Sequence, residues 1–410
     1  MHHNGIKGPR PLSLHLANSR LIWDEASKTA SSVLTQNIWH KDIAERLEAY
    51  KSKLAAAMGP DAAHDDALDA CIRACASARK NSFVHGINKY ISNGFEPNLN
   101  RDTVRHHFGC VTVHDYGSAG AEAGTPILLA PSLVNPFYIM DLMPERSLAL
   151  YLKEQGYRPF LIDWGSPGDE ERAFGIEDYI VRRFKPVLEH VVAVAGGPVP
   201  LIGYCMGGTL SAALATRAQG LISKLILLAA PWNFATKQRI AGRQNATEML
   251  AVIEKLMPGA DVSVDMLQIF FTNVDPTLSD RKFRAYHAGK YQGADADFFS
   301  AMEMWANNGP MLARQVACDC LEGWYRHNLP YKGQWHIGGR PVLPEEIECP
   351  VWVAAPKEDR LVPQDSAFGI VESLRDCEKH EPPSGHIGMV VGNRARRGLW
   401  EPMLKWLERQ

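Results

Sequence analysis

A cysteine set among glycines is the residue in this 410-residue chain whose surroundings point most directly to chemistry. Gly203, Cys205 and Gly207 place a small residue two positions before and after the thiol, and Gly208 follows them. This spacing predicts a sharp turn between a strand and a helix that presents a nucleophile, since glycine permits a strained backbone and a close helix approach. The alternative interpretation is a packed core cysteine, which would need none of these glycines.

An acid and a histidine follow this cysteine along the chain. Asp359 comes after the apolar run 351–355, and His386 lies 27 residues further on, before the last helical stretch. Alpha/beta hydrolases order their catalytic triads as nucleophile, acid and histidine, each after a strand. We therefore expect Cys205, Asp359 and His386 to meet at the carboxyl ends of neighbouring strands.

Other residues compete for two of these roles. Glu358 and Asp365 are the alternative acids, and Asp359 is favoured because it lies just beyond the predicted strand. His380 is the alternative histidine, but its charged neighbours are typical of an exposed loop. Each candidate taken alone also fits an ordinary turn or loop residue, so the prediction depends on their order and spacing together.

The three residue types indicate acyl transfer. A cysteine attacks as its thiolate, and a neighbouring histidine lowers the pKa of the thiol by forming an ion pair with it. Asp359 would hold the tautomer of His386 and stabilise the imidazolium. Exchange between a thiol and a thioester is nearly isoenergetic. Cys205 in place of the usual serine therefore favours acyl transfer from coenzyme A thioesters over simple hydrolysis.

The tetrahedral intermediate of such a reaction needs backbone N–H donors for its oxyanion. The N–H of Met206, directly after the nucleophile, is the first expected donor. The second is expected from the loop at 132–135, where Leu133 and Val134 are the candidates and Val134 is preferred. Removing one such donor typically costs about 3–4 kcal/mol of transition-state stabilisation.

The elements that must position these residues have the pattern of an α/β fold. Short apolar runs typical of buried strands alternate with helical stretches, which predicts a mostly parallel sheet flanked by helices. The strands are expected at 110–116, 126–131, 158–164, 198–205, 223–232 and 349–356, and the helices at 147–157, 176–196 and 207–220. Pro186 is expected to kink or divide the second of these helices.

Four segments follow from this pattern. Residues 1–100 are expected to form an N-terminal helical extension, with helices at 38–58 and 64–91, and residues 101–232 the first part of the core. Residues 233–342 are helical and aromatic-rich, which indicates a cap inserted after the sixth strand, and residues 343–410 complete the core. Five aromatic residues are candidates either for the pocket wall or for the core: Phe137, Trp232, Phe270, Phe271 and Trp305.

Composition excludes several classes of function. The formal net charge of −2 favours neither nucleic acid nor an anionic membrane as a partner. The chain has neither an apolar stretch of transmembrane length nor the apolar run of a signal peptide, so we expect a soluble cytoplasmic protein. The eight cysteines form no C-x-x-C pair, so no metal site is expected, and most of those other than Cys205 are expected to be reduced and buried.

Several stretches together resemble a known family. The chain is similar to the polyhydroxyalkanoate synthases over about residues 105–410, and most similar to the catalytic subunit of the two-component, class III type. The resemblance rests on GYCMGG (203–208), PSLVNPFYIMDLMPERS (131–147), LIDWGSPGDEERAFGIEDYI (161–180), MEMW (302–305), YKGQWHIGGR (331–340), EDRLVP (358–363) and SGHIG (384–388).

The resemblance implies an alpha/beta hydrolase fold and an activity. The nucleophile, acid and histidine of the family correspond to Cys205, Asp359 and His386 in this sequence. They would polymerise (R)-3-hydroxyacyl-CoA into polyhydroxyalkanoate, with CoA release, through a thioester on the cysteine. No cofactor or metal is implied. A homodimer, a second non-catalytic subunit and the surface of polyester granules are the implied partners.

Two other functions fit parts of the pattern, and some residues depart from the family. The alternatives are a cysteine-dependent ester or thioester hydrolase, such as an intracellular polyester depolymerase, and a weakly catalytic relative that binds granules or a partner. Arg360 stands where the family commonly has histidine after the acid. Residues 1–105 do not match a class III subunit, which leaves the class and the partner open.

Overall fold

The computed structural model describes residues 8–29, 41–59, 64–98, 101–117, 124–236 and 240–409. Its contacts divide the chain into two compact units. One unit comprises Met1–Phe95 and Asp275–Ser300, and the other comprises Glu96–Val274 and Ala301–Gln410. The second unit contains the sheet and all the candidate catalytic residues. Among the described residues, no helix combines the length and the apolar character needed to cross a membrane.

The second unit is built on an eight-stranded sheet. The strands are β1 (Val104–Phe108), β2 (Val111–Asp115), β3 (Thr125–Ala130), β4 (Tyr157–Asp163), β5 (Val199–Tyr204), β6 (Ile222–Leu228), β9 (Val351–Ala354) and β10 (Cys377–His380), and their order across the sheet is β1-β2-β4-β3-β5-β6-β9-β10. β2 pairs antiparallel with β1 and β4, and the remaining neighbours are parallel. The predicted, mostly parallel sheet is therefore confirmed.

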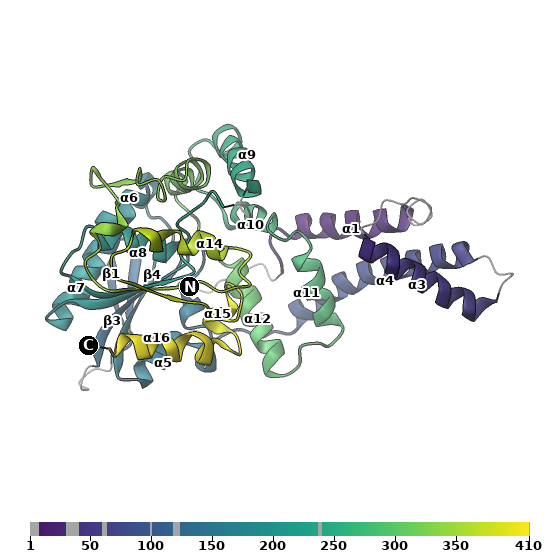
Figure 1. The fold of residues 1–410 in the computed structure, drawn as a ribbon, viewed down its shortest axis with the longest axis horizontal. Coiled ribbons are helices and arrows are strands. Elements are labelled where there is room, and N and C mark those ends of the chain that lie inside the picture. The colour runs from purple at the N-terminus through teal and green to yellow at the C-terminus, as the bar shows by residue number, and fades with distance from the viewer. Residues whose placement is uncertain are drawn as a thin grey trace. The chain divides into compact units, whose positions relative to one another are not determined.

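Helices cover both faces of this sheet. α5 (Leu148–Glu154) and α16 (Glu401–Leu407) lie on one face, and α7 (Lys185–Ala195) and α8 (Met206–Ala215) lie on the other (Figure 1). The central strands are buried on both faces, which is why β5 has no exposed residue. The remaining short helices of this unit are α6 (Ile176–Asp178), α14 (Gln364–Ala367) and α15 (Gly388–Val391).

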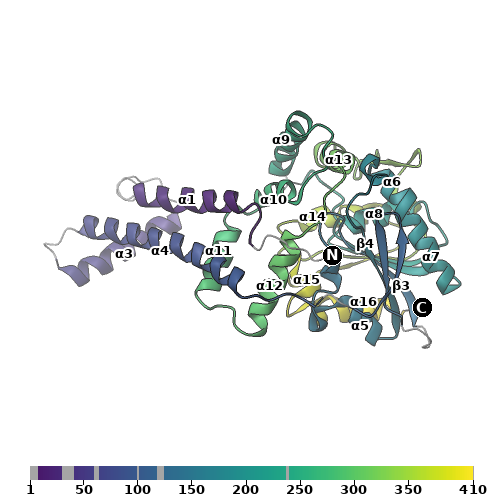
Figure 2. The ribbon, with the colours of Figure 1, turned by 180° about the vertical axis from the view of Figure 1, so that it is seen from behind.

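The residues between β6 and β9 contribute helices to both units. α9 (Ile240–Leu256), α10 (Val264–Thr272), α13 (Arg314–Cys318) and the π-helical η6 (Asp319–Arg326) belong to the unit that contains the sheet. Figure 2 shows α9, α10 and α13 gathered above α14. The insertion after the sixth strand is thus present. The expected single cap at 233–342 remains a prediction, because residues 275–300 group with the N-terminal helices instead.

The N-terminal unit is helical. It contains α1 (Leu12–Lys28), α3 (Lys41–Met58), α4 (His64–Ser92) and α11 (Leu278–His287), and α12 (Ala294–Asn307) begins in it. The expected helix at 38–58 therefore begins at 41 within the described residues. Phe83 on α4 and Phe283 on α11 are both fully buried in its core. A Cβ at Gly86 would lie 2.0 Å from the carbonyl oxygen of Phe283, so α4 and α11 approach at backbone distance.

A buried carboxylate joins α1 to α11 within this unit. Asp280 accepts hydrogen bonds from Ser19 Oγ at 3.0 Å and from Trp23 Nε1 at 2.9 Å, and it forms an ion pair with Arg284. A buried polar group of this kind is costly without partners, so these contacts explain why residues 275–300 belong with the N-terminal helices. Sequence patterns do not reveal pairings over such separations.

Three details of the expected pattern differ in the structure. The helix predicted over 176–196 is divided by a π-helical segment, η4 (Tyr179–Phe184), which ends just before Pro186 at the start of α7. His380 lies in β10 rather than in an exposed loop, because its ring stacks on Trp352. Cys71 and Cys75 are exposed on α4 and the remaining cysteines are half-buried, so the expectation that most cysteines are buried is wrong.

Candidate active site

Cys205 occupies the turn between β5 and α8, as the glycine spacing predicts. Its backbone has φ 54° and ψ −127°, a conformation that residues other than glycine rarely adopt. Two hydrogen bonds hold it: Cys205 N–H donates to the Leu228 carbonyl at 2.8 Å, and Gly208 N–H donates to the Cys205 carbonyl at 2.9 Å. Strain of this kind is characteristic of a functional residue whose side chain must be held at the end of a strand.

The glycines of the turn are needed because the backbones around them are in contact. A Cβ at Gly207 would lie 2.2 Å from the carbonyl oxygens of Ala130 and Pro131, which end β3 and begin the next loop. A Cβ at Gly203 would lie 2.5 Å from the Cα of Gly208. Each of these glycines therefore has a packing role that no larger residue fulfils without a shift of the turn.

We expect the substitution Gly207→Ala to lower the free energy of unfolding by about 3 kcal/mol, because the added methyl group meets two backbone carbonyls that cannot rotate away. Gly197→Ala is the matched control, since a Cβ there meets no atom within 4 Å. The control should change the free energy of unfolding by less than about 0.5 kcal/mol. Urea denaturation of both variants measures the effect, and equal stabilities would contradict the close packing.

Asp359 and His386 are brought together at the carboxyl edge of the sheet. His386 Nδ1 lies 2.7 Å from Asp359 Oδ2, and because a carboxylate only accepts, the imidazole N–H donates. The other carboxylate oxygen of Asp359 accepts from the N–H groups of Leu361 and Val362, each at 2.8 Å. Asp359 follows β9 and His386 precedes α15, so the chain order predicted for the two residues corresponds to a direct contact.

The histidine is both buried and strongly polarised. Burial by itself lowers the pKa of His386, but the charges of Asp359 and Cys205 and its hydrogen bonds to both residues outweigh burial and raise the pKa to about 10. The imidazole therefore interacts with Cys205 on one side and Asp359 on the other. This arrangement holds a protonated imidazole between the candidate acid and the candidate nucleophile.

We expect the charge on His386 to make the stability of the fold depend on pH. Its pKa of about 10 in the folded protein lies above the value of about 6.5 for an unfolded histidine, so the folded protein retains a proton that the unfolded chain releases. This contribution is complete below about pH 6.5 and is lost as the pH rises toward about 10. The free energies of unfolding of the wild type and His386→Gln should therefore converge as the pH rises. A constant or widening difference would contradict this.

Tyr204 supports the histidine from within the core. It is almost fully buried, its ring lies 5.2 Å from the imidazole ring, and its hydroxyl donates to the backbone carbonyl of His386 at 3.3 Å. The residue before the nucleophile thus packs against the loop that carries the histidine. Burial and the nearby charges of Cys205 and Asp359 raise the pKa of Tyr204, so this hydroxyl stays a donor.

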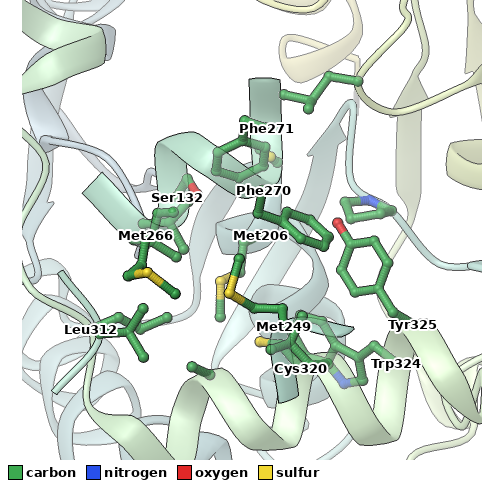
Figure 3. Close-up of a pocket in the computed structure, with 18 of the residues that line it drawn as sticks. Ser132, Met206, Met249, Met266, Phe270, Phe271, Leu312, Cys320, Trp324 and Tyr325 are labelled. Atoms are coloured by element: carbon green, nitrogen blue, oxygen red, sulfur yellow. The ribbon is translucent and has the colours of Figure 1, made fainter. Parts of the chain in front are cut away.

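Cys205 is one of the residues that line an apolar pocket. Figure 3 shows this pocket with Met206, the residue after the cysteine, in its wall. The core contributes Cys205, Met206 and Val134 to its wall. The elements between β6 and β9 contribute most of the remaining side chains, among them Met249, Ile253, Met266, Phe270, Trp324 and Tyr325. Such a wall suits an apolar acyl chain and keeps the reacting atoms away from bulk water.

The structure places both candidate oxyanion donors in this pocket. Met206 is the first residue of α8, and the first N–H groups of a helix have no partner within the helix. Val134 lies on the loop after β3, against which the cysteine turn is packed. The role of the two N–H groups as donors to an oxyanion at Cys205 remains a prediction.

The pocket contains residues that were not predicted from the sequence. Phe270 and Phe271 are in its wall, whereas Phe137, Trp232 and Trp305 pack elsewhere among the described residues. The polar and sulfur-containing residues of the wall were missed; these are Ser132, Met249, Met266, Cys320 and Tyr325. Ser132 lies in the loop after β3, and the others lie on helices of the aromatic-rich insertion, whose faces toward the pocket depend on tertiary packing.

The competing residues are occupied elsewhere or exposed. His380 Nε2 lies 2.6 Å from the carbonyl oxygen of Gly398, and His380 is not among the residues of the pocket wall. Glu358, Asp365 and Arg360 have exposed side chains. Asp359 and His386 therefore remain the preferred acid and histidine.

Comparison with known proteins agrees with this geometry. Residues 125–392 match the family described as the alpha/beta hydrolase fold. The poly(3-hydroxyalkanoate) polymerase subunit PhaC of Haloferax mediterranei is 27% identical over 301 residues, which are 72% of this chain and 61% of that protein. The protein of the same name from Allochromatium vinosum is 27% identical over 288 residues, which are 69% of this chain and 80% of that protein.

A solved structure shares the fold. Rv0554 from Mycobacterium tuberculosis aligns with a TM-score of 0.50 and 15% identity, over 74% of this chain and 98% of that one. These comparisons confirm the predicted fold class and the predicted resemblance to polyhydroxyalkanoate synthases. The chain spans about three-fifths of the length of the Haloferax relative.

Proposed function

Since the chain belongs to the alpha/beta hydrolase fold family, we propose that it is the member of that family which polymerises (R)-3-hydroxyacyl-CoA into polyhydroxyalkanoate and releases CoA. The relatives named poly(3-hydroxyalkanoate) polymerase support this reaction. The observation that carries the proposal is a cysteine, in place of serine, on the strained turn beside a hydrogen-bonded His386–Asp359 pair.

The first step loads the acyl group onto the enzyme. The Cys205 thiolate attacks the thioester carbonyl carbon, and the new C–S bond forms as the carbonyl electron pair moves to oxygen. The backbone N–H groups of Met206 and Val134 stabilise that oxyanion. The intermediate collapses, the bond to the CoA sulfur breaks, and CoA leaves with the proton that His386 had taken from Cys205.

The second step forms the ester bond. The hydroxyl group of another 3-hydroxyacyl-CoA attacks the acyl carbonyl on Cys205, and His386 accepts the hydroxyl proton while Asp359 stabilises the imidazolium. The C–S bond to Cys205 breaks, so the lengthened chain is held on CoA and the thiol is regenerated. Cys205 then attacks this longer thioester and releases CoA, which repeats the cycle.

The apolar pocket supports transfer rather than hydrolysis. Its wall offers water few hydrogen-bond partners, and a thioester on Cys205 therefore persists until an alcohol arrives. The alternative is a cysteine-dependent ester or thioester hydrolase on the same scaffold, which would need water at the same carbonyl.

We extend the proposal to location and partners on the resemblance alone. The enzyme would act in the cytoplasm at the surface of its polyester granules, as a dimer with a non-catalytic second subunit. The residues expected to serve catalysis all lie in the unit that contains the sheet, which leaves the N-terminal helical unit available for such contacts.

Incubation with 3-hydroxybutyryl-CoA tests the proposed reaction. Free CoA is followed with a thiol reagent, and the second product is identified as insoluble polymer or as free acid. CoA release with polymer is the expected result. CoA release with free 3-hydroxybutyrate alone would establish the hydrolase instead. Lack of release, with and without an added class III partner subunit, would contradict an activity toward this substrate.

A further inference from the structure

Ser132 is a buried hydroxyl without a partner in the candidate active site. Its side chain is 3% exposed, and among the described residues its Oγ makes no hydrogen bond. Leaving a hydroxyl unpaired in apolar surroundings is unfavourable, so a ligand that pairs with this hydroxyl in the pocket would gain a hydrogen bond. The mechanism above assigns it no role.

The position of Ser132 is fixed by its neighbours. It follows Pro131, whose carbonyl oxygen accepts from Trp164 Nε1 at 2.9 Å and packs against Gly207 of the cysteine turn. Ser132 and Cys205 line the same pocket. Figure 3 shows Ser132 on the side of the pocket opposite Trp324 and Tyr325. The hydroxyl is therefore held near the nucleophile, in a wall that is otherwise almost entirely apolar.

The chemistry of the proposed substrate leaves one group in need of a partner. A 3-hydroxyacyl thioester has a carbonyl oxygen, an apolar side chain and a 3-hydroxyl group. The backbone N–H groups of Met206 and Val134 serve the carbonyl oxygen, and methionine and aromatic side chains surround the apolar part. The 3-hydroxyl enters the same apolar pocket and needs a hydrogen-bond partner there.

We propose that the Ser132 hydroxyl binds the 3-hydroxyl group of the first acyl unit loaded onto Cys205. This inference rests on the proposed function and names the residue that selects its substrate class. A serine hydroxyl both donates and accepts, so it pairs with an alcohol in either direction. A site built to pair a substrate hydroxyl discriminates against the analogue that lacks it, because the buried protein group is then left without a partner.

The test compares two substrates in three proteins. CoA release in the first turnover is measured with 3-hydroxybutyryl-CoA and with butyryl-CoA, for the wild type, Ser132→Ala and Ser366→Ala. Ser366 is the matched control because its Oγ is also buried and unpartnered among the described residues but lies outside the pocket wall. Ser132→Ala should lower kcat/KM for 3-hydroxybutyryl-CoA about tenfold, the effect of one lost hydrogen bond, and leave butyryl-CoA within about twofold. Ser366→Ala should preserve the preference of the wild type.

Several results would overturn the proposal. An equal loss on both substrates would place Ser132 in the oxyanion site or in the packing, and an absence of loss would exclude contact with the hydroxyl. If Ser132→Ala does not fold, the wild type still decides, because equal rates with the two substrates contradict hydroxyl recognition. A wild type that releases CoA from neither substrate contradicts the proposed function itself, which separates the two failures.

Discussion

The substitution Cys205→Ala is expected to abolish polymer formation and the covalent loading of acyl groups, with a fall in turnover of at least about 10³-fold. The reason is that the variant lacks the atom that forms the thioester, and no other thiol replaces it: Cys320 is in the same pocket, but burial raises the pKa of its thiol well above the ordinary value. Release of CoA from 3-hydroxybutyryl-CoA measures the loss.

The control for this prediction is the fold of the variant. The side chain of Cys205 is only partly buried and its removal adds no atom, so the thermal unfolding midpoint should stay close to that of the wild type. Cys377→Ala, which alters a thiol remote from the pocket, should retain activity. Full activity of Cys205→Ala would remove this residue from the reaction and with it the proposed thioester.

The substitution Asp359→Asn is expected to slow chain elongation by roughly 10³-fold and to leave the first loading of Cys205 much less affected. Asparagine keeps the shape of the side chain but removes the charge that raises the pKa of His386, so that pKa should fall. Loading needs only the transfer of a proton from a thiol, whereas elongation needs the removal of a proton from an alcohol, a much weaker acid. Elongation therefore depends more on a strong, correctly oriented base.

Rapid-quench kinetics separate the two steps, and NMR titration of the imidazole reports the pKa. Asp365→Asn is the matched control, because Asp365 is the exposed acid six residues later, whereas the hydrogen bond of the histidine is made with Asp359. Equal losses at loading and elongation, or no loss at either, would contradict a role for Asp359 as the residue that orients and charges His386.

The positions of the candidate catalytic residues in the fold were predictable because local sequence signals indicate them. The glycines around Cys205 predict the turn. A Cβ atom added at Gly203 or Gly207 would lie only 2.2–2.5 Å from backbone atoms, so these positions require glycine. Asp359 and His386 follow strands whose order in a parallel sheet fixes which loops meet. Residues whose positions are set by the sequence of one turn, or by the order of strands in a sheet, can be predicted from the sequence.

The pocket was not predictable in the same way. Ser132 is one polar residue in a loop, and only the packed structure shows that its hydroxyl is buried without a partner. Met249, Met266 and Tyr325 belong to helices whose facing sides are chosen by tertiary packing. β1 (Val104–Phe108) was missed because it is an edge strand with polar, partly exposed residues.

The sequence pattern also did not predict which distant segments pack together. Residues 275–300 have the composition of the surrounding insertion, yet Asp280 pairs with α1 and Phe283 packs against α4. Buried contacts between segments this far apart in the sequence, 261 residues for Ser19 and Asp280, leave no periodic signal. His380 was misplaced for a related reason: its charged neighbours indicated a loop, but the strand it occupies is short and lies at the edge of the sheet.

In the proposed mechanism, Cys205 carries a growing polyester chain. The most direct test is mass spectrometry of the peptide that contains Cys205, after the reaction with 3-hydroxybutyryl-CoA is quenched in acid during turnover. The proposed mechanism predicts a ladder of adducts on this thiol, separated by the mass of one hydroxybutyryl unit. A single hydroxybutyryl adduct that never lengthens would make the protein a thioesterase, and a ladder on another residue would contradict the assignment of Cys205.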